Sequence, residues 1–233
     1  VDPVDDPFTD ADEVISTNED TPLTDTVLTG TASVDGPVTV TQFTVAGDAT
    51  TYNPGETATI TGVGTLVING DGSYTFTPVG DYNGPVPVVT YTLTDGSGTD
   101  DTSTLTITVD PVDDPFTDAD EVISTNEDTP LTDTVLTGTA SVDGPVTVTQ
   151  FTVAGDATTY NPGETATITG VGTLVINGDG SYTFTPVGDY NGPVPVVTYT
   201  LTDGSGTNDT STLTITVDPV DDPFTDADEV IST

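Results

Sequence analysis

Carboxylates are the chemically active side chains that dominate this sequence. The 233 residues include 39 Asp and Glu and no Lys, Arg, His or Cys, so the formal charge is -39. Within residues 1–108, 8 of the 17 acids fall in the first 20 positions, and the same cluster recurs from Asp110. Two carboxylates about 4 Å apart repel by up to about 4 kcal/mol at an effective dielectric near 20. Such a cluster either stays spread in solvent or captures a cation.

Calcium is the cation that suits several flexible oxygen ligands. The sequence lacks His and Cys, which are the usual ligands of transition metals. We therefore expect Ca²⁺ as the cofactor. The alternative is that the acids only solubilise the surface, with the prolines between them as ordinary linker residues.

The composition also limits the classes of function. Without His, Cys, Lys or Arg the chain has no nucleophile–base pair and no phosphate clamp. Only paired carboxylates remain, and a glycosidase would also need a cleft, so we expect no enzyme. The negative charge repels nucleic acids and anionic lipids. The sequence has no apolar stretch of about 18 residues and no signal-like segment, so we expect no membrane insertion, and we expect a monomer.

The chain is an internal repeat with a long period. The segment VDPVDDPFTDADEVIST begins at Val1, Val109 and Val217, and the first two copies differ only at Asp100 against Asn208. A period of 108 residues is too long for a solenoid and fits one β-sandwich. The predicted domains are 1–108 with an acidic linker at 1–13, 109–216 with a linker at 109–121, and the start of a third repeat at 217–233.

Alternation of apolar and polar residues predicts an all-β fold. Six segments of the first repeat show this period of two, which is typical of half-buried strands; they cover 39–47, 57–62, 64–70, 72–78, 88–96 and 103–109. Shorter strands near 14–17 and 23–32 bring the total to about eight. This number predicts tandem immunoglobulin-like (Ig-like) β-sandwich domains in a linear array.

Strand direction predicts which acids meet. The last strand, 103–109, must run toward the next repeat, so the 18–20 turn and the 78–86 loop share the pole that faces it, and the 95–101 loop lies at the opposite pole. We therefore expect calcium ligands at the central junction from the first repeat, the linker and the second repeat. They are Glu19, Asp20, Asp81 and Asn83; then Asp110, Asp113 and Asp114; then Asp118, Asp120, Asp203 and Asp209.

Several segments also resemble a known family. NEDTP (18–22), NGDGSYTFTP (69–78), DYNG (81–84), YTLTDGSG (91–98) and DTSTLTITV (101–109) resemble the bacterial Ig-like and cadherin-like repeats of RTX adhesins. The resemblance implies a calcium-stiffened extender, exported by a type I system to the extracellular surface of a Gram-negative bacterium. The arrangement of acids likewise resembles cadherin junctions, where adjacent repeats share calcium ions.

Three functions follow as alternatives. The first is a structural spacer, made rigid by Ca²⁺ at the junctions of adjacent repeats, that projects a ligand-binding region away from the cell. The second is binding by the repeats themselves, to a glycan, to ice or to a homophilic partner. The third is passive display on flexible beads that need no metal.

Overall fold

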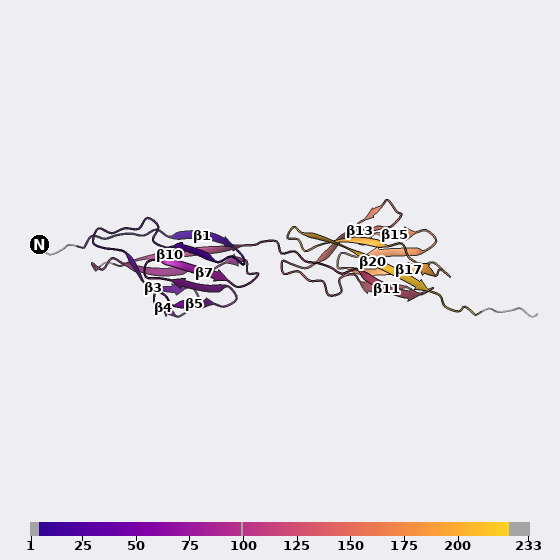
Figure 1. The fold of residues 1–233 in the computed structure, drawn as a ribbon, viewed down its shortest axis with the longest axis horizontal. Helices are drawn as coiled ribbons and strands as arrows, with labels where there is room; N and C mark the ends of the chain where they lie inside the picture. Colours follow the sequence, from indigo (N-terminus) through magenta and orange to yellow (C-terminus); the bar gives the residue numbers. More distant parts are fainter. Residues whose placement is uncertain (1–4, 99, 224–233) are drawn as a thin grey trace, which may run out of the picture. The chain divides into compact units, whose positions relative to one another are not determined.

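The protein consists of two all-β units. The computed structural model describes residues 5–98 and 100–223 (Figure 1). The chain divides between Val112 and Asp113 into two compact units. The expected start of a third repeat at 217–233 lies mostly outside the described residues, which end at 223.

Each unit contains two sheets. In the first unit the larger sheet has the order β1-β10-β9-β3-β4, with β8 also paired to β10, and the smaller has the order β2-β7-β6-β5. The strands are β1 (Glu13–Asn18), β2 (Leu23–Thr26), β3 (Thr39–Val45), β4 (Thr51–Tyr52), β5 (Thr57–Ile60), β6 (Gly64–Ile68), β7 (Ser73–Pro78), β8 (Gly84–Pro85), β9 (Val89–Thr94) and β10 (Asp100–Asp110).

The second unit repeats this topology, with sheets β11-β20-β19-β13-β14 (β18 on β20) and β12-β17-β16-β15. Its strands are β11 (Glu121–Asn126), β12 (Leu131–Thr134), β13 (Thr147–Val153), β14 (Thr159–Tyr160), β15 (Thr165–Ile168), β16 (Gly172–Ile176), β17 (Ser181–Pro186), β18 (Gly192–Pro193), β19 (Val197–Thr202) and β20 (Asn208–Asp218).

The predicted fold class is confirmed, and the strands follow from the alternation. In β7 the side chains of Tyr74 and Phe76 are buried, and the threonines between and after them are exposed. The described part of each unit has ten strands where about eight were expected. The additional two, β4 and β8, have two residues each, too short to show a period. The expected 23–32 strand ends at Thr26, where the chain turns away from β7.

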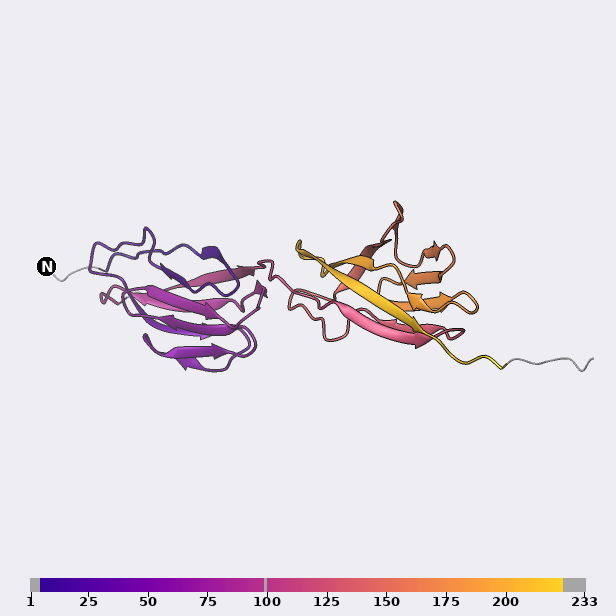
Figure 2. The same cartoon turned by 45° about the vertical axis from the view of Figure 1, so that its right-hand side comes forward.

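One parallel pair sets which loops share an end of the sandwich. β1 runs parallel to β10 from Glu13 opposite Leu105 to Asn18 opposite Asp110, whereas the other strand pairs are antiparallel. Figure 2 shows the equivalent pair of the second unit, with β20 (yellow) running beside β11 (pink) and then out of the sandwich. The turn after the first strand therefore lies where the chain leaves the unit.

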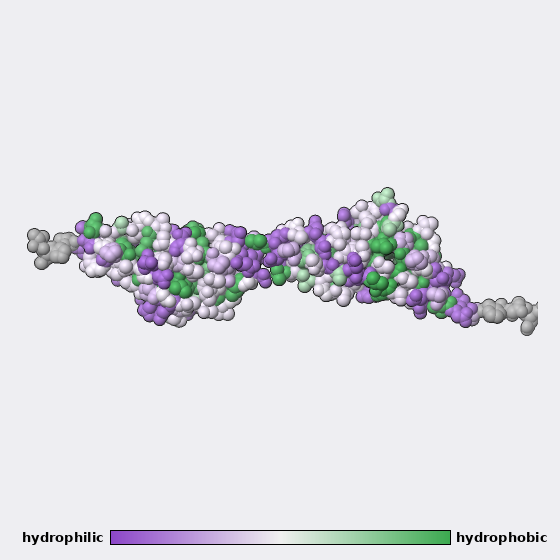
Figure 3. Space-filling model, in the orientation of Figure 1, coloured by the Kyte–Doolittle hydropathy of each residue, from purple (hydrophilic) through white to green (hydrophobic). Residues whose placement is uncertain are grey.

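Each unit has its own core. Two separate clusters of buried side chains fill the space between the sheets, around Phe43, Phe76 and Tyr91 in the first unit and around their counterparts in the second. The large apolar residues that are exposed among the described residues are all valines, scattered among polar ones on the face in Figure 3. In the described part of the chain, no helix is long and apolar enough to cross a membrane.

Separate cores predict separate unfolding. Phe76 is fully buried in the first unit, and Phe184 takes its place in the second. Phe76→Ala should cost about 3–5 kcal/mol through the lost burial and the cavity, and lower the Tm of a unit of this size by at least about 10 °C. We expect calorimetry to resolve two transitions, one of them at the wild-type temperature.

Thr75→Ala is the control, because Thr75 is the exposed neighbour on the same strand. It should leave the unfolding curve nearly unchanged. If Phe76→Ala instead displaces one undivided transition, the two cores do not unfold independently.

Candidate metal centre

A buried glutamate ties the outgoing chain to the end of each unit. In the second unit Glu127 is 6 % exposed. Its Oε1 accepts a hydrogen bond from the Val220 N–H at 2.5 Å, and its Oε2 accepts one from the Asn191 side-chain amide at 3.1 Å. The Glu127 N–H donates to the Asp218 carbonyl at 2.9 Å. Since β11 runs parallel to β20, the residue after β11 meets the chain as it leaves β20.

Three more carboxylates gather at this exit end. Oxygens of Asp128, Asp189 and Asp222 lie within 4.8 Å of one another, and we call these three the exit acids. The Asp189 N–H donates to Asp128 Oδ1 at 3.2 Å. Both Asp128 and Asp189 have φ of 59°, a left-handed conformation that Asp tolerates better than most residues. Strained backbone of this kind persists where the surroundings hold it.

The first unit repeats these contacts. Glu19 is 3 % exposed and accepts from the Val112 N–H at 2.5 Å and the Asn83 amide at 3.2 Å. The Asp81 N–H donates to Asp20 Oδ1 at 3.2 Å, and both residues have positive φ, 56° at Asp20 and 59° at Asp81. The prediction that the 18–20 turn and the 78–86 loop share one end is thus confirmed. The role of these four residues as ligands stays a prediction.

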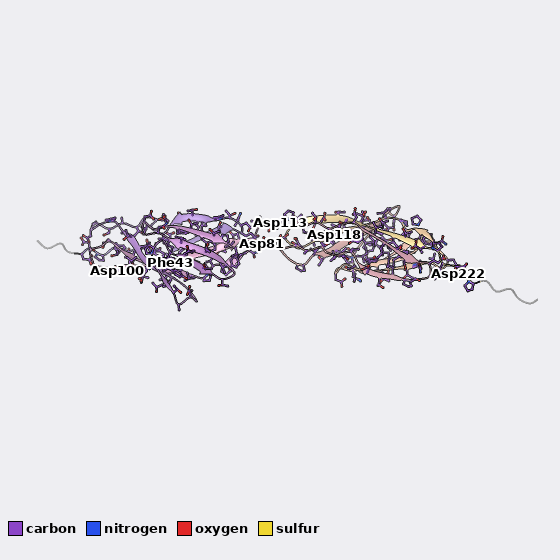
Figure 4. All side chains as sticks on the ribbon, turned by 60° about the horizontal axis from the view of Figure 1, so that its bottom comes forward. Phe43, Asp81, Asp100, Asp113, Asp118 and Asp222 are labelled. Carbon is purple, nitrogen blue, oxygen red and sulfur yellow. The ribbon has the colours of Figure 1, made fainter. Side chains whose placement is uncertain are left out.

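The entry end of each unit carries a second acidic group. In the second unit oxygens of Asp113, Asp143 and Asp203 lie within 4.8 Å of one another, and we call these three the entry acids. The Ser141 hydroxyl donates to Asp203 Oδ2 at 2.6 Å. The Ser205 hydroxyl lies 2.6 Å from Asp203 Oδ1 and also contacts Asp113. Figure 4 shows Asp113 and Asp222 at opposite ends of the unit.

Hydroxyl donors keep two of the entry acids, Asp113 and Asp203, ionised. The hydrogen bonds from Ser141 and Ser205 hold the pKa of Asp203 below its ordinary value. The hydroxyls of Ser205 and Thr207 do the same for the pKa of Asp113. Hydrogen bonds to the charged form favour it. These carboxylates therefore present anionic oxygens even at mildly acidic pH.

The corresponding acids of the first unit are Asp5, Asp35 and Asp95, with oxygens again within 4.8 Å of one another. The Ser33 hydroxyl donates to Asp95 Oδ2 at 2.5 Å, and the Ser97 hydroxyl donates to Asp95 Oδ1 at 2.6 Å. These bonds lower the pKa of Asp95. The entry group thus recurs with its hydroxyl donors.

The sequence analysis missed Asp143 and its serine partner. Both belong to the loop Ser-Val-Asp-Gly at 141–144. A Cβ on Gly144 would lie 2.9 Å from the Asp203 carbonyl oxygen, so glycine allows this loop to press against Asp203. The signal was a turn-like Asp-Gly between strands, which by itself indicates only a turn.

Three expected ligands make a different set of contacts. Asp118 Oδ2 accepts from the Tyr199 hydroxyl at 2.7 Å, and the Asp118 N–H donates to Asp209 Oδ2 at 2.7 Å. Asp120 Oδ1 accepts from the Thr212 N–H at 2.8 Å. In the described structure these carboxylates lie outside the entry acids and fasten the incoming chain to the sandwich.

Two linker residues contribute through their main chain. Asp110 ends β10, where its carbonyl accepts from the Glu19 N–H at 2.9 Å. The Asp114 N–H donates to Asp143 Oδ2 at 2.7 Å. Hydrogen bonds therefore hold both sides of the linker.

The donor chemistry fits a hard cation. The entry and exit groups offer carboxylate oxygens from separate loops. Calcium takes six to eight oxygen ligands in flexible geometry, whereas zinc prefers Cys and His, which the chain lacks. Three carboxylates, completed by carbonyls and water, fit calcium.

Comparison with known proteins assigns the family. The family model described as "Cadherin-like domain" matches residues 4–110 and 112–218. The chain belongs to the cadherin-like domain family. Each match covers one complete set of ten strands. Domains of this family are typically extracellular, non-enzymatic modules that generally bind Ca²⁺.

The solved structures to which the chain shows similarity include two cadherins. The protocadherin gamma B2 extracellular cadherin domains 1–5 are 14 % identical, with 94 % of this chain and 40 % of that chain covered and a TM-score of 0.41. Drosophila N-cadherin EC1–4 is 14 % identical, with 90 % of this chain and 49 % of that chain covered and a TM-score of 0.38. This chain therefore spans less than half the length of either. The titin domains Z1Z2 in complex with telethonin are 17 % identical, with 92 % of this chain and 95 % of that chain covered and a TM-score of 0.34. No curated protein matches the sequence.

Removing the hydroxyls beside Asp95 and Asp203 should lower the stability of the protein to a degree that depends on pH. Ser33→Ala combined with Ser141→Ala should let the pKa of Asp95 and Asp203 rise toward the ordinary value. Because the folded pKa lies below the unfolded one, this contribution to stability is present above about pH 4 and lost as pH falls through the folded pKa. In chelator, the unfolding free energy of the variant should be lower than that of wild type. This difference should be larger at about pH 7 than at about pH 2.5.

Urea unfolding at the two pH values measures this difference. Thr75→Ala with Thr183→Ala is the control, since both threonines are exposed on β7 and β17. The same deficit at both pH values would show that the serines act only through packing.

Proposed function

We propose that this chain is part of the extender region of a bacterial surface adhesin of the RTX type. Calcium bound at the junctions between repeats stiffens the array, which projects a ligand-binding region away from a Gram-negative cell. The observation that carries the proposal is that acidic groups occur at both ends of a unit, each formed by loops that are distant in sequence. A spacer needs a connection at each end, and a binding module does not.

The connectivity of the chain supports ions at the junction. Val112 is held by Glu19 of the first unit, and the next residue, Asp113, is held by Ser205 of the second. One peptide bond therefore separates a residue fixed to an exit end from one fixed to an entry end. Pro111 and Pro115 restrict the backbone of this linker. Such a preset linker loses little entropy when its carboxylates bind metal.

The charge of the chain gives calcium a role in folding as well. With a formal charge of -39 and no cationic side chain, repulsion between carboxylates opposes the compact state. Extracellular calcium modules have dissociation constants of about 10⁻⁴ to 10⁻³ M. One such site at a hundredfold excess of ligand adds about 2.7 kcal/mol of stability. This dependence suits a chain that is secreted unfolded and folds in the calcium outside the cell.

Near-identity of the repeats also favours a spacer. The single difference, Asp100 against Asn208, lies at the exposed first residue of β10 and β20. The second candidate, direct binding of a glycan, ice or a like repeat, would be favoured by exposed aromatic rings. Among the described residues the exposed large apolar side chains are all valines, and this observation favours the spacer.

Calcium should change both the dimensions and the stability of the fragment. We expect small-angle X-ray scattering in millimolar calcium to fit one extended conformation, and the distribution of dimensions to broaden in chelator. The unfolding free energy should rise by about 2.7 kcal/mol for each site saturated a hundredfold. Identical scattering and identical stability in the two conditions would leave the acids as a solubilising surface.

Matched substitutions test the entry acids themselves. Asp203→Asn removes one charge from the entry group, whereas Asp179→Asn removes one from an exposed turn where the carboxylate accepts hydrogen bonds from Ser181. We expect calorimetric titration to give at least about tenfold weaker calcium binding for Asp203→Asn, because ligand charge sets affinity. Asp179→Asn should bind as wild type does. Equal weakening by the two substitutions would mean that calcium affinity depends only on the net charge of the protein.

A further inference from the structure

A separate acidic cleft lies along the side of the second unit. It has a volume of about 280 Å³, which suits the end of one side chain more than a drug-sized ligand. The cleft opens between β11, the outermost strand of one sheet, and β12, the outermost strand of the other. The lining residues are Asp120, Glu121, Val122, Ile123, Asp133, Thr134, Thr137 and Tyr182.

Strand alternation turns two of its acids toward the gap between the sheets. Glu121 alternates with exposed Val122 and so faces the same side as Ile123, which packs on the core. Asp133 is directly opposite Tyr182 across β12 and β17. Opposite residues of an antiparallel pair lie on the same face. Each sheet therefore contributes one carboxylate on its core-facing side at this edge, half-buried at Glu121 and exposed at Asp133.

The hydroxyl of a buried tyrosine opens into the same cleft without a partner among the described residues. Tyr182 is 2 % exposed and lines the cleft, yet its hydroxyl makes no hydrogen bond to any described residue. The neighbouring Tyr199 hydroxyl, by contrast, contacts Asp118 at 2.7 Å and Glu121 at 3.3 Å. A phenol oxygen can accept a hydrogen bond. The Tyr182 hydroxyl is therefore placed to accept one from a ligand in the cleft.

The same residue types recur in the first unit. Glu13 and Asp25 occupy the equivalent positions on β1 and β2, and Asp25 is opposite Tyr74. Tyr74 is 2 % exposed, and its hydroxyl also has no hydrogen bond to a described residue. The arrangement therefore does not depend on one copy of the repeat.

The electrostatics of the cleft favour a positive ligand. Burial raises the pKa of Glu121 above its ordinary value, and repulsion from Asp118 and Asp133 adds to the shift. Burial, together with repulsion from Asp133 and Glu121, raises the pKa of Tyr182 to about 12, so the phenol stays protonated. A cation would offset this repulsion, and the chain has no Lys, Arg or His to provide one.

The groups of three carboxylates close enough to share a metal ion do not include Glu121 or Asp133. Among the described residues those groups use acids of the end loops and linkers instead. Glu121 and Asp133 line the cleft from different strands, so an ion with several donors can address both. Guanidinium and ammonium groups have such donors.

We propose that this lateral cleft binds one ammonium or guanidinium group, of the kind found on a small amine or on a Lys or Arg side chain of another protein. Glu121 and Asp133 accept its N–H donors, and the Tyr182 hydroxyl completes the site as an acceptor. The site is independent of calcium at the ends of the unit. Binding at this cleft and the extender function can therefore be tested separately.

Methylguanidinium is the probe, with methylurea as its neutral counterpart. The whole fragment is titrated in millimolar calcium, so that the end groups are saturated first, and backbone amide signals are followed by NMR. We expect saturable shifts at Glu121, Val122, Thr134 and their copies in the first unit, with methylurea giving none. Equal shifts with potassium ions, or shifts confined to the end loops, would overturn the proposal.

Substitutions made in both repeats identify the groups involved. Glu13→Gln with Glu121→Gln should weaken methylguanidinium binding by about tenfold or more, and Tyr74→Phe with Tyr182→Phe should weaken it less. Asp71→Asn with Asp179→Asn removes the same charge from exposed turns and should leave binding unchanged. Equal weakening in this control would contradict a specific site. Thermal unfolding checks that each variant is folded.

Two further ligands distinguish a small free amine from a protein side chain as the source of the cation. Methylammonium represents a free amine, and N-acetyl-arginine amide represents a side chain carried on a peptide. Tighter binding of methylammonium supports a small-amine ligand, and tighter binding of the arginine derivative supports a protein ligand. Saturable binding of neither compound would overturn the proposal.

Discussion

The absence of any cationic side chain is the constraint on which the rest of this structure depends. With 39 carboxylates and no Lys, Arg or His, no acid can be neutralised by a side chain of the same molecule. Each acid that leaves bulk water must instead find neutral donors. Glu127 is satisfied by a main-chain N–H and an Asn amide, and Asp203 by two serine hydroxyls. The structural role of Ser, Thr, Tyr and Asn follows from this shortage.

Neutral donors hold a carboxylate without cancelling its charge. The hydroxyls beside Asp113 and Asp203 hold the pKa of these two acids low, so both keep their charge. In a salt bridge, the charge of the acid would already be neutralised by a cationic side chain of the same protein. An acid held only by hydrogen bonds still attracts an external cation. This links the composition to the calcium chemistry expected of a cadherin-like domain.

The acids also attach the linkers to the sandwich. Asp118 fastens the incoming chain through Tyr199, and Glu127 fastens the outgoing chain through Val220. Both contacts join residues more than 80 positions apart. The linkers are thus part of the hydrogen-bonded structure of each unit, and the family match at 112–218 includes the incoming one.

The sequence by itself determined the period, the strands and the end at which several acids lie. Alternation places Phe76 inside because a strand has only two faces, and the direction of β10 brings the turn at Glu19 toward the outgoing chain. The tertiary structure alone decided the remaining contacts. Asp143 joins Asp203 because a glycine lets one loop approach another. Tyr182 meets Glu121 only because two sheets stack with their outermost strands on the same side. Local patterns report which way a side chain faces along its own strand. Which residues it meets depends on loop conformation and sheet packing, which arise from interactions across the whole unit.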